Sequence, residues 1–483
     1  MTISSPNVET VQNPSTLGVR EASDLIDAGA LTPLEIMHDI FARIDAVEDT
    51  IHAYLRFDRE GAFRLAEAAT KRALKGERLG PLDGIPFAVK DNIYTANFET
   101  TAGSRVPQKH APSLNATVVS LLQQGGAILL GKLNTWEYGT GTGAVYDDLP
   151  NPVARNPWNT DHYTGGSSSG SGAAVAAGTA MFTIGTDTGG SVRLPAAGCG
   201  VVGLKPTYGH ISRYGIMPNC WSFDTPGPLT ASVEDSHLIY TALAHQDDKD
   251  AACLPPAREE IEFDLLHDIS GLRVGVVTNL DPDKAPPQAE ILEALAQSAD
   301  ILEKLGATVV PIEMPLSPSE YRAIAVPINR SESFSIHEQD FLEYRHLMGK
   351  ALRTKLEVGM YMRATDYIAA LRQRSVLVEQ TNKLFDEVDV VLLPITYETA
   401  PRFDDPEAVA RFTTGSAGSP FSLTGHPALS LPISFTKDNI PVSIQMAAGF
   451  NQEQALLSCA NQVEKALPNR PKRASIKQMI GEQ

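Results

Sequence analysis

The sequence of 483 residues contains few cysteines and no recognisable metal-binding motif. The four cysteines, Cys199, Cys220, Cys253 and Cys459, are widely spaced and form no C-x-x-C pair. This spacing argues against a structural zinc site or a redox couple and predicts buried free thiols. The eleven histidines form no H-E-x-x-H motif and no close cluster with acidic residues. We therefore expect neither a metal nor another cofactor.

Long hydrophobic runs are also missing. No segment approaches the roughly 20 apolar residues that span a bilayer. The first fifteen residues, Met1 to Ser15, are polar, contain Pro6 and Pro14, and lack the basic and apolar regions of a secretory leader. These absences predict a cytoplasmic protein that does not bind membranes.

Positive charge is scarce relative to negative charge. Lysine and arginine total 40 against 58 aspartates and glutamates, which gives a net charge of −18. The average surface would repel a nucleic-acid backbone, so we expect no nucleic-acid partner. A hydrophobic content of 42% and a charged content of 20% are typical of a globular chain. The sequence leaves a homodimer open.

Glycine and hydroxyl residues, in contrast, are concentrated between Gly165 and Arg193. This stretch begins G-G-S-S-S-G-S-G, continues through a run of small apolar residues, and ends G-T-D-T-G-G-S-V-R. Glycine lets backbone amides face a ligand without a Cβ in the way, and the serines are candidate nucleophiles. The apolar residues between the two ends argue against a flexible linker. We therefore predict a buried, structured site.

Strand and helix patterns alternate along most of the chain. The apolar run 85–92 reads as a buried strand that ends at Lys90, residues 115–124 read as a helix, and 127–130 as the next strand. Further strands are expected at 272–277, 308–312, 388–393, 427–432 and 442–446, with helices at 287–305 and 452–467. This order predicts parallel crossovers and an α/β fold, with helices on both faces of a large mixed, mostly parallel β-sheet.

The chain divides into two regions in this reading. Residues 1–75 are expected to form N-terminal helices that pack on the core, one of them opened by a capping box of Thr32, Pro33 and Glu35. Residues 76–483 are expected to form the α/β core, with a helical insertion at about 317–375 that serves as a pocket wall or lid. We expect a single domain overall.

Two nucleophile arrangements compete in the glycine-rich stretch. Residues 166–170 match G-x-S-x-G, which would make Ser168 the nucleophile of an α/β-hydrolase elbow. The elbow requires an apolar strand before it, whereas residues 159–164 are polar and turn-like. His162, His210 and His426 lie near the glycine-rich segments and could serve a serine–histidine mechanism, although we interpret them as hydrogen-bonding surface residues.

The motifs together resemble those of the amidase signature hydrolases. The resemblance rests on A-V-K-D-N at 88–92, G-G-S-S-S-G-S at 165–171 and G-T-D-T-G-G-S-V-R-L-P-A at 185–196, with supporting matches at 155–158, 203–209 and 423–428. It covers nearly the whole chain and implies that family's fold. It also implies hydrolysis of a carboxylic amide through an acyl-enzyme, with release of ammonia or an amine.

The resemblance assigns roles to particular residues. It implies Ser191 as nucleophile, Ser167 as a bridging serine after a cis peptide, and Lys90 as the base. The run Thr188, Gly189 and Gly190 would supply the oxyanion amides. Ser168, Asp187 and Arg193 would support this machinery, and the last two are equally well explained as a structural ion pair.

The substrate is less well defined by the sequence. Trp136, Tyr138, Thr140 and Trp221 flank the motifs and are candidate pocket residues for a small-molecule amide. A carbamate or urea stays an alternative substrate. The family also contains the glutamine-hydrolysing component of an amidotransferase complex, which usually has glutamine where this chain has Leu194, and this difference favours a stand-alone amidase.

Overall fold

The chain folds around one large β-sheet. A computed structural model describes residues 12–108, 115–141, 143–255, 258–281, 286–468 and 472–481. In these ranges the sheet has 11 strands in the order β1-β3-β2-β4-β6-β5-β10-β11-β9-β7-β8. The strands are β1 (Tyr54–Phe57), β2 (Pro86–Lys90), β3 (Ile128–Leu133), β4 (Phe182–Asp187), β5 (Val202–Lys205), β6 (Thr225–Thr230), β7 (Arg273–Val277), β8 (Thr308–Ile312), β9 (Val390–Pro394), β10 (Ala428–Phe435) and β11 (Pro441–Ala448).

The sheet is mixed, as predicted, but its pairings are not mostly parallel. Strands β2 and β3, β2 and β4, β7 and β8, and β7 and β9 pair in parallel. The other six pairings are antiparallel. The expectation of a mostly parallel sheet is therefore wrong. The antiparallel pairings of β6 with β4 and β5, and of β10 with β5 and β11, lie at the centre of the sheet.

Helices cover both faces of the sheet, as predicted. The main ones are α4 (Thr117–Gln124), α5 (Ser169–Ala177), α6 (Arg193–Cys199), α7 (Val233–Leu243), α9 (Ala289–Lys304), α14 (Ser419–Thr424) and α15 (Glu453–Ala466). Strand β9 shows the two-sided packing, because Val390 and Leu392 belong to the core cluster that includes α9 and α15. Val391 and Leu393 belong to a second cluster, which includes residues of α14. This alternation is the period of two expected for a strand buried on both faces.

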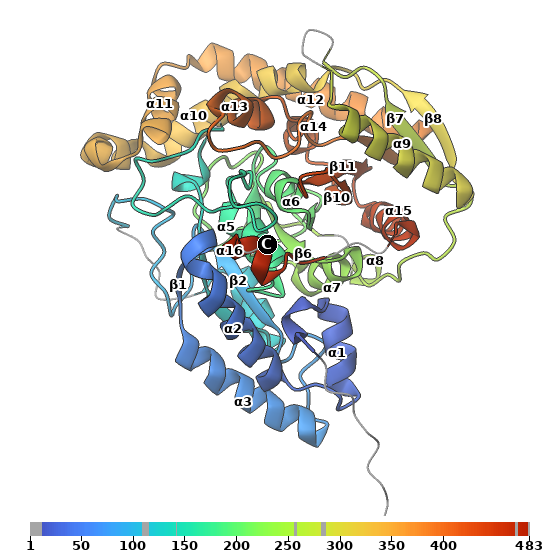
Figure 1. Cartoon of the computed structure of the whole chain (residues 1–483). Helices are drawn as coiled ribbons and strands as arrows, with labels where there is room; N and C mark the ends of the chain where they lie inside the picture. The colour runs from blue at the N-terminus through green and yellow to red at the C-terminus, as the bar shows by residue number, and fades with distance from the viewer. Residues whose placement is uncertain are drawn as a thin grey trace, which may run out of the picture.

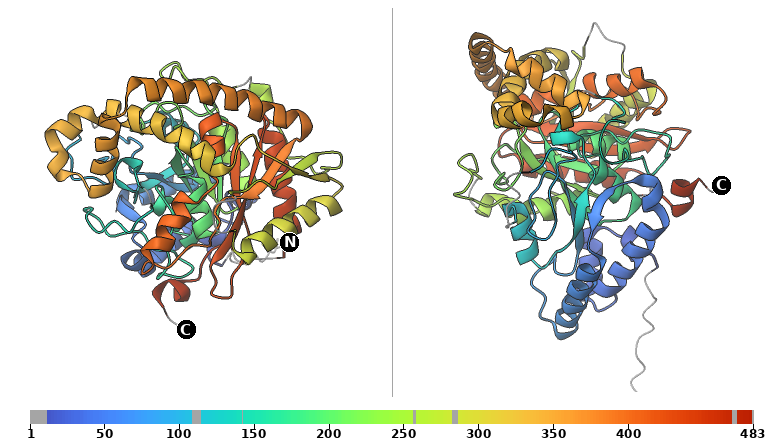
Figure 2. Two further views of the ribbon diagram at one scale, coloured as in Figure 1. Left: turned by 90° about the horizontal axis from the view of Figure 1, so that it is seen from above. Right: turned by 90° about the vertical axis from the view of Figure 1, so that its left-hand side faces the viewer.

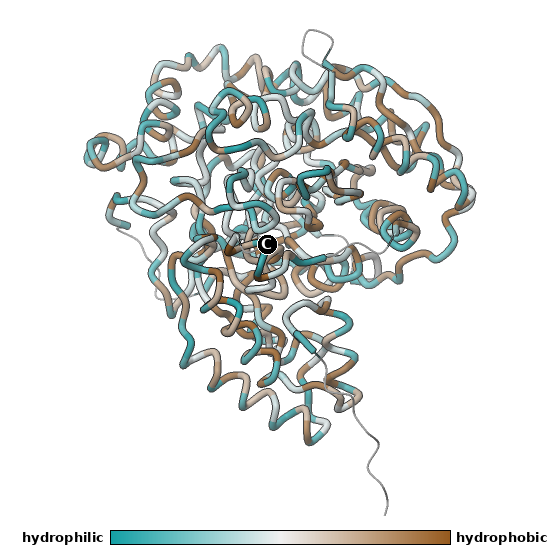
Figure 3. The backbone as a smooth tube through the Cα atoms, viewed as in Figure 1, coloured by the Kyte–Doolittle hydropathy of each residue, from teal (hydrophilic) through white to brown (hydrophobic). Residues whose placement is uncertain are grey.

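The N-terminal helices lie at one end of the molecule (Figure 1). They are α1 (Val19–Asp27), α2 (Pro33–Ile51) and α3 (Arg59–Lys75). The predicted capping box of Thr32 and Glu35 opens α2. Teal and brown alternate along α2 and α3 in Figure 3, as in amphipathic helices with one buried face.

The N-terminal region is tied to the core by more than helix packing. Strand β1, which the sequence pattern did not reveal, pairs with β3 at the edge of the sheet. Helix α2 packs against α5 and against α16 (Ile476–Ile480) near the other end of the described chain. Residues 1–11 of the predicted N-terminal region lie outside the described residues. The contacts support a single domain, which stays a prediction.

The predicted helical insertion consists of α10 (Pro318–Tyr344), a short 3-10 turn, α11 (Lys350–Met360) and α12 (Ala364–Glu387). It therefore extends past the expected boundary near residue 375. These helices lie along the end of the molecule opposite the N-terminal helices (Figures 1 and 2). Helix α10 packs against α11, α12 and α14.

Strand β6 was not predicted, although it lies in the centre of the sheet. Its sequence, T-P-G-P-L-T, contains Pro226 and Pro228, and proline cannot donate a ladder hydrogen bond. The structure accommodates both prolines because β5 pairs with the end of β6, at Leu229 and Thr230, beyond them. All six residues of β6 are buried.

The four cysteines are buried and unpaired, which confirms the prediction of free thiols. Among the described residues, none of the helices is long and apolar enough to cross a membrane. The same part of the chain holds no group of three or more His, Cys, Asp or Glu side chains that could bind a metal ion.

Candidate active site

The stretch from Gly165 to Arg193 is buried and structured, as predicted. It forms a loop, helix α5, strand β4 and a second loop that leads into α6. The peptide bond between Gly166 and Ser167 is cis, in agreement with the resemblance. A side chain at Gly166 would meet the indole ring of Trp136 at 2.1 Å, so only glycine fits at this close approach.

Lys90 lies at the end of β2 and points into the site. Its side chain is fully buried. The Nζ atom lies 2.8 Å from Ser167 Oγ and 2.8 Å from Thr186 Oγ1. Asn92 Nδ2 donates to the same Thr186 oxygen at 3.2 Å. Strands β2 and β4, which pair in parallel, thus bring Lys90 and Thr186 to one edge, where Ser167 meets them.

The burial of Lys90 disfavours its ammonium form. Burial lowers the pKa of Lys90 to about 7, while the carboxylates of Asp224 and Asp187 act in the opposite direction. Neither carboxylate is hydrogen-bonded to Lys90 Nζ. The two hydrogen-bond partners of Nζ are the neutral hydroxyls of Ser167 and Thr186. A substantial fraction of Lys90 is therefore the neutral amine near pH 7.

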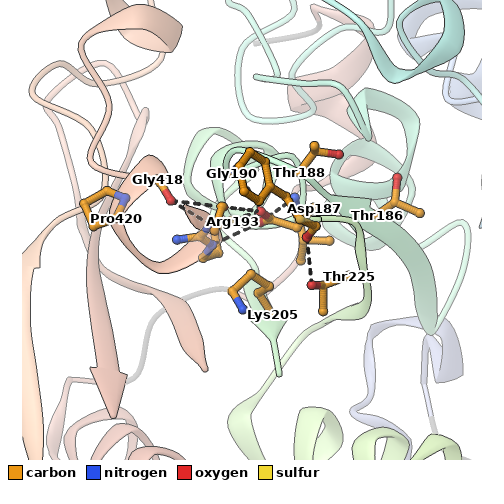
Figure 4. Close-up of polar contacts among 12 residues, drawn as sticks. Thr186, Asp187, Thr188, Gly190, Arg193, Lys205, Thr225, Gly418 and Pro420 are labelled. Atoms are coloured by element: carbon orange, nitrogen blue, oxygen red, sulfur yellow. Dashed lines mark hydrogen bonds and ion pairs between the residues drawn. The ribbon is translucent and has the colours of Figure 1, made fainter. Parts of the chain in front are cut away.

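A buried ion pair fixes the loop that carries Ser191. Asp187 accepts hydrogen bonds from Arg193 Nε at 3.0 Å and from Arg193 Nη2 at 2.9 Å. Both side chains are fully buried, and Arg193 also donates to the Gly418 carbonyl at 3.0 Å. Figure 4 shows Arg193 between Asp187 and Gly418. Burial raises the pKa of Asp187, but the charge and hydrogen bonds of Arg193 outweigh it and hold that pKa at about 2. Asp187 is therefore ionised at neutral pH.

The Asp187 carboxylate also accepts a hydrogen bond from one of the predicted oxyanion donors. The Gly190 amide donates to Asp187 Oδ1 at 2.8 Å, so Gly190 is not a free donor and its assignment is wrong. The Val192 amide donates to Asp187 Oδ2 at 3.2 Å. The amides of Thr188, Gly189 and Ser191 have no acceptor among the described residues, and all three residues line a cleft. Asp187 thus holds two amides of the loop, and the remaining donors are free for a ligand.

Ser191 and Ser168 have different environments. Ser191 is partly exposed to the cleft, and its Oγ makes no hydrogen bond to any described residue. Ser168 is fully buried; its amide donates to the Ser191 carbonyl at 3.4 Å, and its Oγ lies 3.4 Å from the backbone of Thr186. A buried serine tied to backbone cannot act as the exposed nucleophile of an elbow. Ser168 instead connects the two loops of the site.

The cleft beside Ser191 has a volume of about 120 Å³. Trp136 and Thr140 line it, as expected. Tyr138 does not, because its left-handed backbone (φ 51°) turns the side chain away and its hydroxyl donates to Asp340 at 2.9 Å. Trp221 does not either; it is 50% exposed and stacks on Arg213. The two pocket assignments of Tyr138 and Trp221 are therefore wrong.

Several residues of the cleft were not found from the sequence. They include Asn219 and Phe223 beside β6, and Arg322, Arg330 and Lys355 from the helical insertion. Phe223 takes the place expected for Trp221, two residues away in the same turn. The insertion was predicted to form a pocket wall, but its helical pattern did not show which charged residues face inward.

The three candidate histidines do not line the cleft. His162 bonds to the Ala400 carbonyl, as expected for a hydrogen-bonding loop residue. His210 and His426 are almost fully buried rather than on the surface. His210 contacts Tyr240 and Asn451, and His426 contacts Thr424 and Asn382. Among the described residues, none of the hydrogen bonds connects a histidine to Ser167 or Ser191.

Comparison with known proteins places these features in a family. The family model described as Amidase matches residues 35–457. The A-type subunit of the glutamyl-tRNA(Gln) amidotransferase of Synechococcus sp. (strain CC9311) is 32% identical over 491 residues, which cover 95% of this chain and 100% of the relative. The protein of the same description from Chloroflexus aggregans is 34% identical over 467 residues, covering 91% and 94%.

Solved structures also superimpose on nearly the whole chain. A chain from an inhibitor-bound complex, described as a vestigial complex that reveals the origins of an s-triazine catabolic enzyme, superimposes with a TM-score of 0.83 at 30% identity, covering 95% of this chain and 100% of that one. The peptide amidase of Stenotrophomonas maltophilia superimposes with a TM-score of 0.80 at 28% identity, covering 95% and 98%.

The buried ion pair predicts a large stability effect for Asp187→Asn. This change leaves the Arg193 charge buried without its counterion, so the free energy of unfolding should fall by about 3–5 kcal/mol in urea denaturation. Asp161→Asn is the matched control, because Asp161 pairs with Arg402 at 3.3 Å on the surface and its removal should cost under about 1 kcal/mol. Equal losses in the two variants would contradict the special role of the buried pair.

Proposed function

Because the chain belongs to the Amidase family, we propose that it is an amidohydrolase that cleaves the C–N bond of a small carboxylic amide through an acyl-enzyme on Ser191. Ser167 and Lys90 relay the protons in this proposal. The observation that carries it is the 2.8 Å contact between Lys90 Nζ and Ser167 Oγ in a fully buried environment beside the Ser191 loop.

The first step is attack by Ser191 on the amide carbonyl. A serine hydroxyl is a weak nucleophile until a base accepts its proton. In our proposal, Ser191 gives its proton to Ser167 Oγ while Ser167 gives its own proton to the neutral amine of Lys90. The structure contains no hydrogen bond between the two serine hydroxyls among the described residues, and such contacts commonly tighten only when substrate is bound.

The second part of the cycle reverses the relay. Lys90, now an ammonium, returns a proton through Ser167 to the departing nitrogen, and ammonia or an amine leaves. Water then attacks the acyl-enzyme with the same relay as base and releases the carboxylic acid and free Ser191. No cofactor is required for this sequence of bonds made and broken.

The developing oxyanion requires preorganised donors. We assign this role to the amides of Thr188, Gly189 and Ser191, which have no acceptor among the described residues. Each such donor contributes about 3 kcal/mol of transition-state stabilisation in related hydrolytic sites. The Asp187 carboxylate holds the intervening Gly190 amide, so that the loop keeps one conformation.

Single substitutions in the relay test this function. Ser191→Ala, Ser167→Ala and Lys90→Ala should each lower kcat on an amide by about 10⁴-fold or more, because the relay acts as a unit. Steady-state release of amine measures the effect, and labelling by a fluorophosphonate probe reports on the nucleophile.

Ser171→Ala is the matched control. Ser171 lies in the same run, is fully buried, and its hydroxyl has no hydrogen-bond partner among the described residues, so this change should alter kcat by less than about threefold. Turnover or probe labelling retained by folded Ser191→Ala would rule out Ser191 as the nucleophile.

A second candidate function is suggested by the amidotransferase subunits among the relatives. In that case the chain would hydrolyse glutamine within a complex. Leu194, which follows Arg193 and is 3% exposed, puts an apolar side chain in the cleft wall where that subunit usually has glutamine, and this favours the stand-alone enzyme.

Turnover by the isolated chain separates the two functions. A stand-alone amidase should hydrolyse at least one amide of a panel of primary amides, anilides, carbamates and ureas without a partner. Hydrolysis confined to glutamine, and dependent on added partner subunits, would reverse the choice.

A further inference from the structure

One wall of the cleft is a single stripe of helix α10. Its five lining residues are Arg322, Ala325, Val326, Asn329 and Arg330. Their spacing of i, i+3, i+4, i+7 and i+8 places them on one face of the helix. Arg322 and Arg330 therefore lie on the helix face that lines the same cleft as Ser191.

Neither arginine has a counterion among the described residues. No aspartate or glutamate in this part of the chain forms an ion pair with Arg322 or Arg330, and neither side chain makes a hydrogen bond there. Each side chain is only partly exposed. Burial lowers the pKa of Arg322, and burial together with the neighbouring charge of Arg322 lowers the pKa of Arg330. Guanidinium groups nevertheless stay protonated in proteins, so ten N–H donors lack an acceptor within the described ranges.

The other described residues that line the cleft do not neutralise this positive wall. Lys355 on α11 also lines the cleft, and its Nζ contacts only neutral oxygens, those of Thr140 and Asn219. Burial lowers the pKa of Lys355 to about 7, and the charge of Arg330 contributes to this shift. No aspartate or glutamate is among the residues that line the cleft within the described ranges. The whole chain carries a charge of −18, so this local excess of positive charge is opposite to its average.

We propose that the cleft selects small amides that carry a carboxylate and no ammonium group, with Arg322 and Arg330 binding the carboxylate while Ser191 attacks the amide carbonyl. This inference rests on the proposed function. A guanidinium fork matches the two oxygens of a carboxylate and supplies the acceptors that both arginines lack. An α-ammonium group, as in free glutamine, would find no acidic partner among the described residues of the cleft and would face two guanidinium groups instead.

A larger outer cavity adjoins this site. It has a volume of about 560 Å³ and shares Arg330 and Lys355 with the cleft. Its other charged lining residues are Lys350, Arg353, Asp147 and Asp148. Arg330, Lys350 and Arg353 of the described chain therefore face two acids in the outer cavity, and Lys355, with its lowered pKa, adds only part of a charge near neutral pH. This excess of positive charge extends the attraction for an anionic substrate outward from Ser191.

Matched pairs of amides test the selection. Succinamate and succinamide differ only in a carboxylate replaced by a neutral amide on the acyl side, and N-acetylglycine and N-acetylglycinamide differ in the same way on the amine side. We expect kcat/KM for the anion to exceed that for its neutral partner by about tenfold or more in at least one pair, which identifies the side that carries the charge. Equal or lower values for the anion in both pairs would overturn the proposal.

Substitution of the arginines tests the residues. Arg322→Gln and Arg330→Gln should each reduce the anion-to-neutral ratio of kcat/KM by about tenfold or more. Arg372→Gln on α12 is the control, because Arg372 is exposed and lines neither the cleft nor the outer cavity. A ratio that is unchanged in both cleft variants, or changed equally by Arg372→Gln, would contradict the assignment.

Binding to the Ser191→Ala variant separates this inference from the proposed function. Calorimetry should detect succinate and succinamate binding at least about tenfold tighter than succinamide and glutamine, with the preference lost when Arg322→Gln is added. Anion binding without hydrolysis by the intact enzyme would contradict the acyl-enzyme proposal and leave the anion site in place. Hydrolysis without a preference for anions would contradict the anion site and leave the acyl-enzyme proposal in place.

Discussion

The burial of Lys90 at the end of β2 is the constraint on which the rest of the site depends. A lysine that is to accept a proton near neutral pH must be held where its ammonium is poorly solvated and poorly neutralised. Lys90 satisfies both conditions, because its Nζ atom contacts two hydroxyls while Asp187 and Asp224 act only at a distance. The sheet supplies the burial, since β2 is flanked by β3 and β4 and all five of its residues are buried.

Other buried lysines show why burial alone does not make a base. Burial also lowers the pKa of Lys132 to about 8 and that of Lys205 to about 7. Lys132 contacts the Ile93 carbonyl and Thr100, and Lys205 contacts the Pro206 carbonyl. Neither lysine reaches a serine of the glycine-rich stretch. Lys90 differs because it contacts Ser167. Strand β2, paired with β3 and β4, holds Lys90 in place, and the loop that begins at Gly165 brings Ser167 to it.

The sequence predicted the parts of this arrangement that follow from local patterns. An apolar run that ends in charge located Lys90 at a strand end, and the run of glycine and serine identified the two loops. The sequence could not predict which side chains and backbone amides of the loops face the cleft, because that depends on the local backbone conformation. Tyr138 and Thr140 are two residues apart, yet a left-handed residue in a tight turn sends one into the core and the other into the cleft. The Gly190 amide is not a free oxyanion donor, because it donates a hydrogen bond to the carboxylate of Asp187, three residues earlier.

The helical insertion illustrates a second limit. Its sequence pattern predicted helices, but a long helix with charged residues on several faces does not reveal which face meets the cleft. That choice is made by the packing of α10 against α11, α12 and α14. The central strand β6 was not predicted for a comparable reason. Whether a strand can contain prolines depends on where the neighbouring strand, here β5, stops pairing with it.

The protonation state of Lys90 can be measured directly. In protein carrying ¹³Cε- and ¹⁵Nζ-labelled lysine, the resonance that disappears in Lys90→Met should titrate with a pKa near 7, since burial lowers the pKa of this group to about 7. The amine should be charged below that pH and neutral above it, so the base form should increase as the pH rises. If the resonance assigned to Lys90 instead showed an amine that stays protonated up to about pH 10, as an unperturbed lysine does, Lys90 could not be the base near neutral pH.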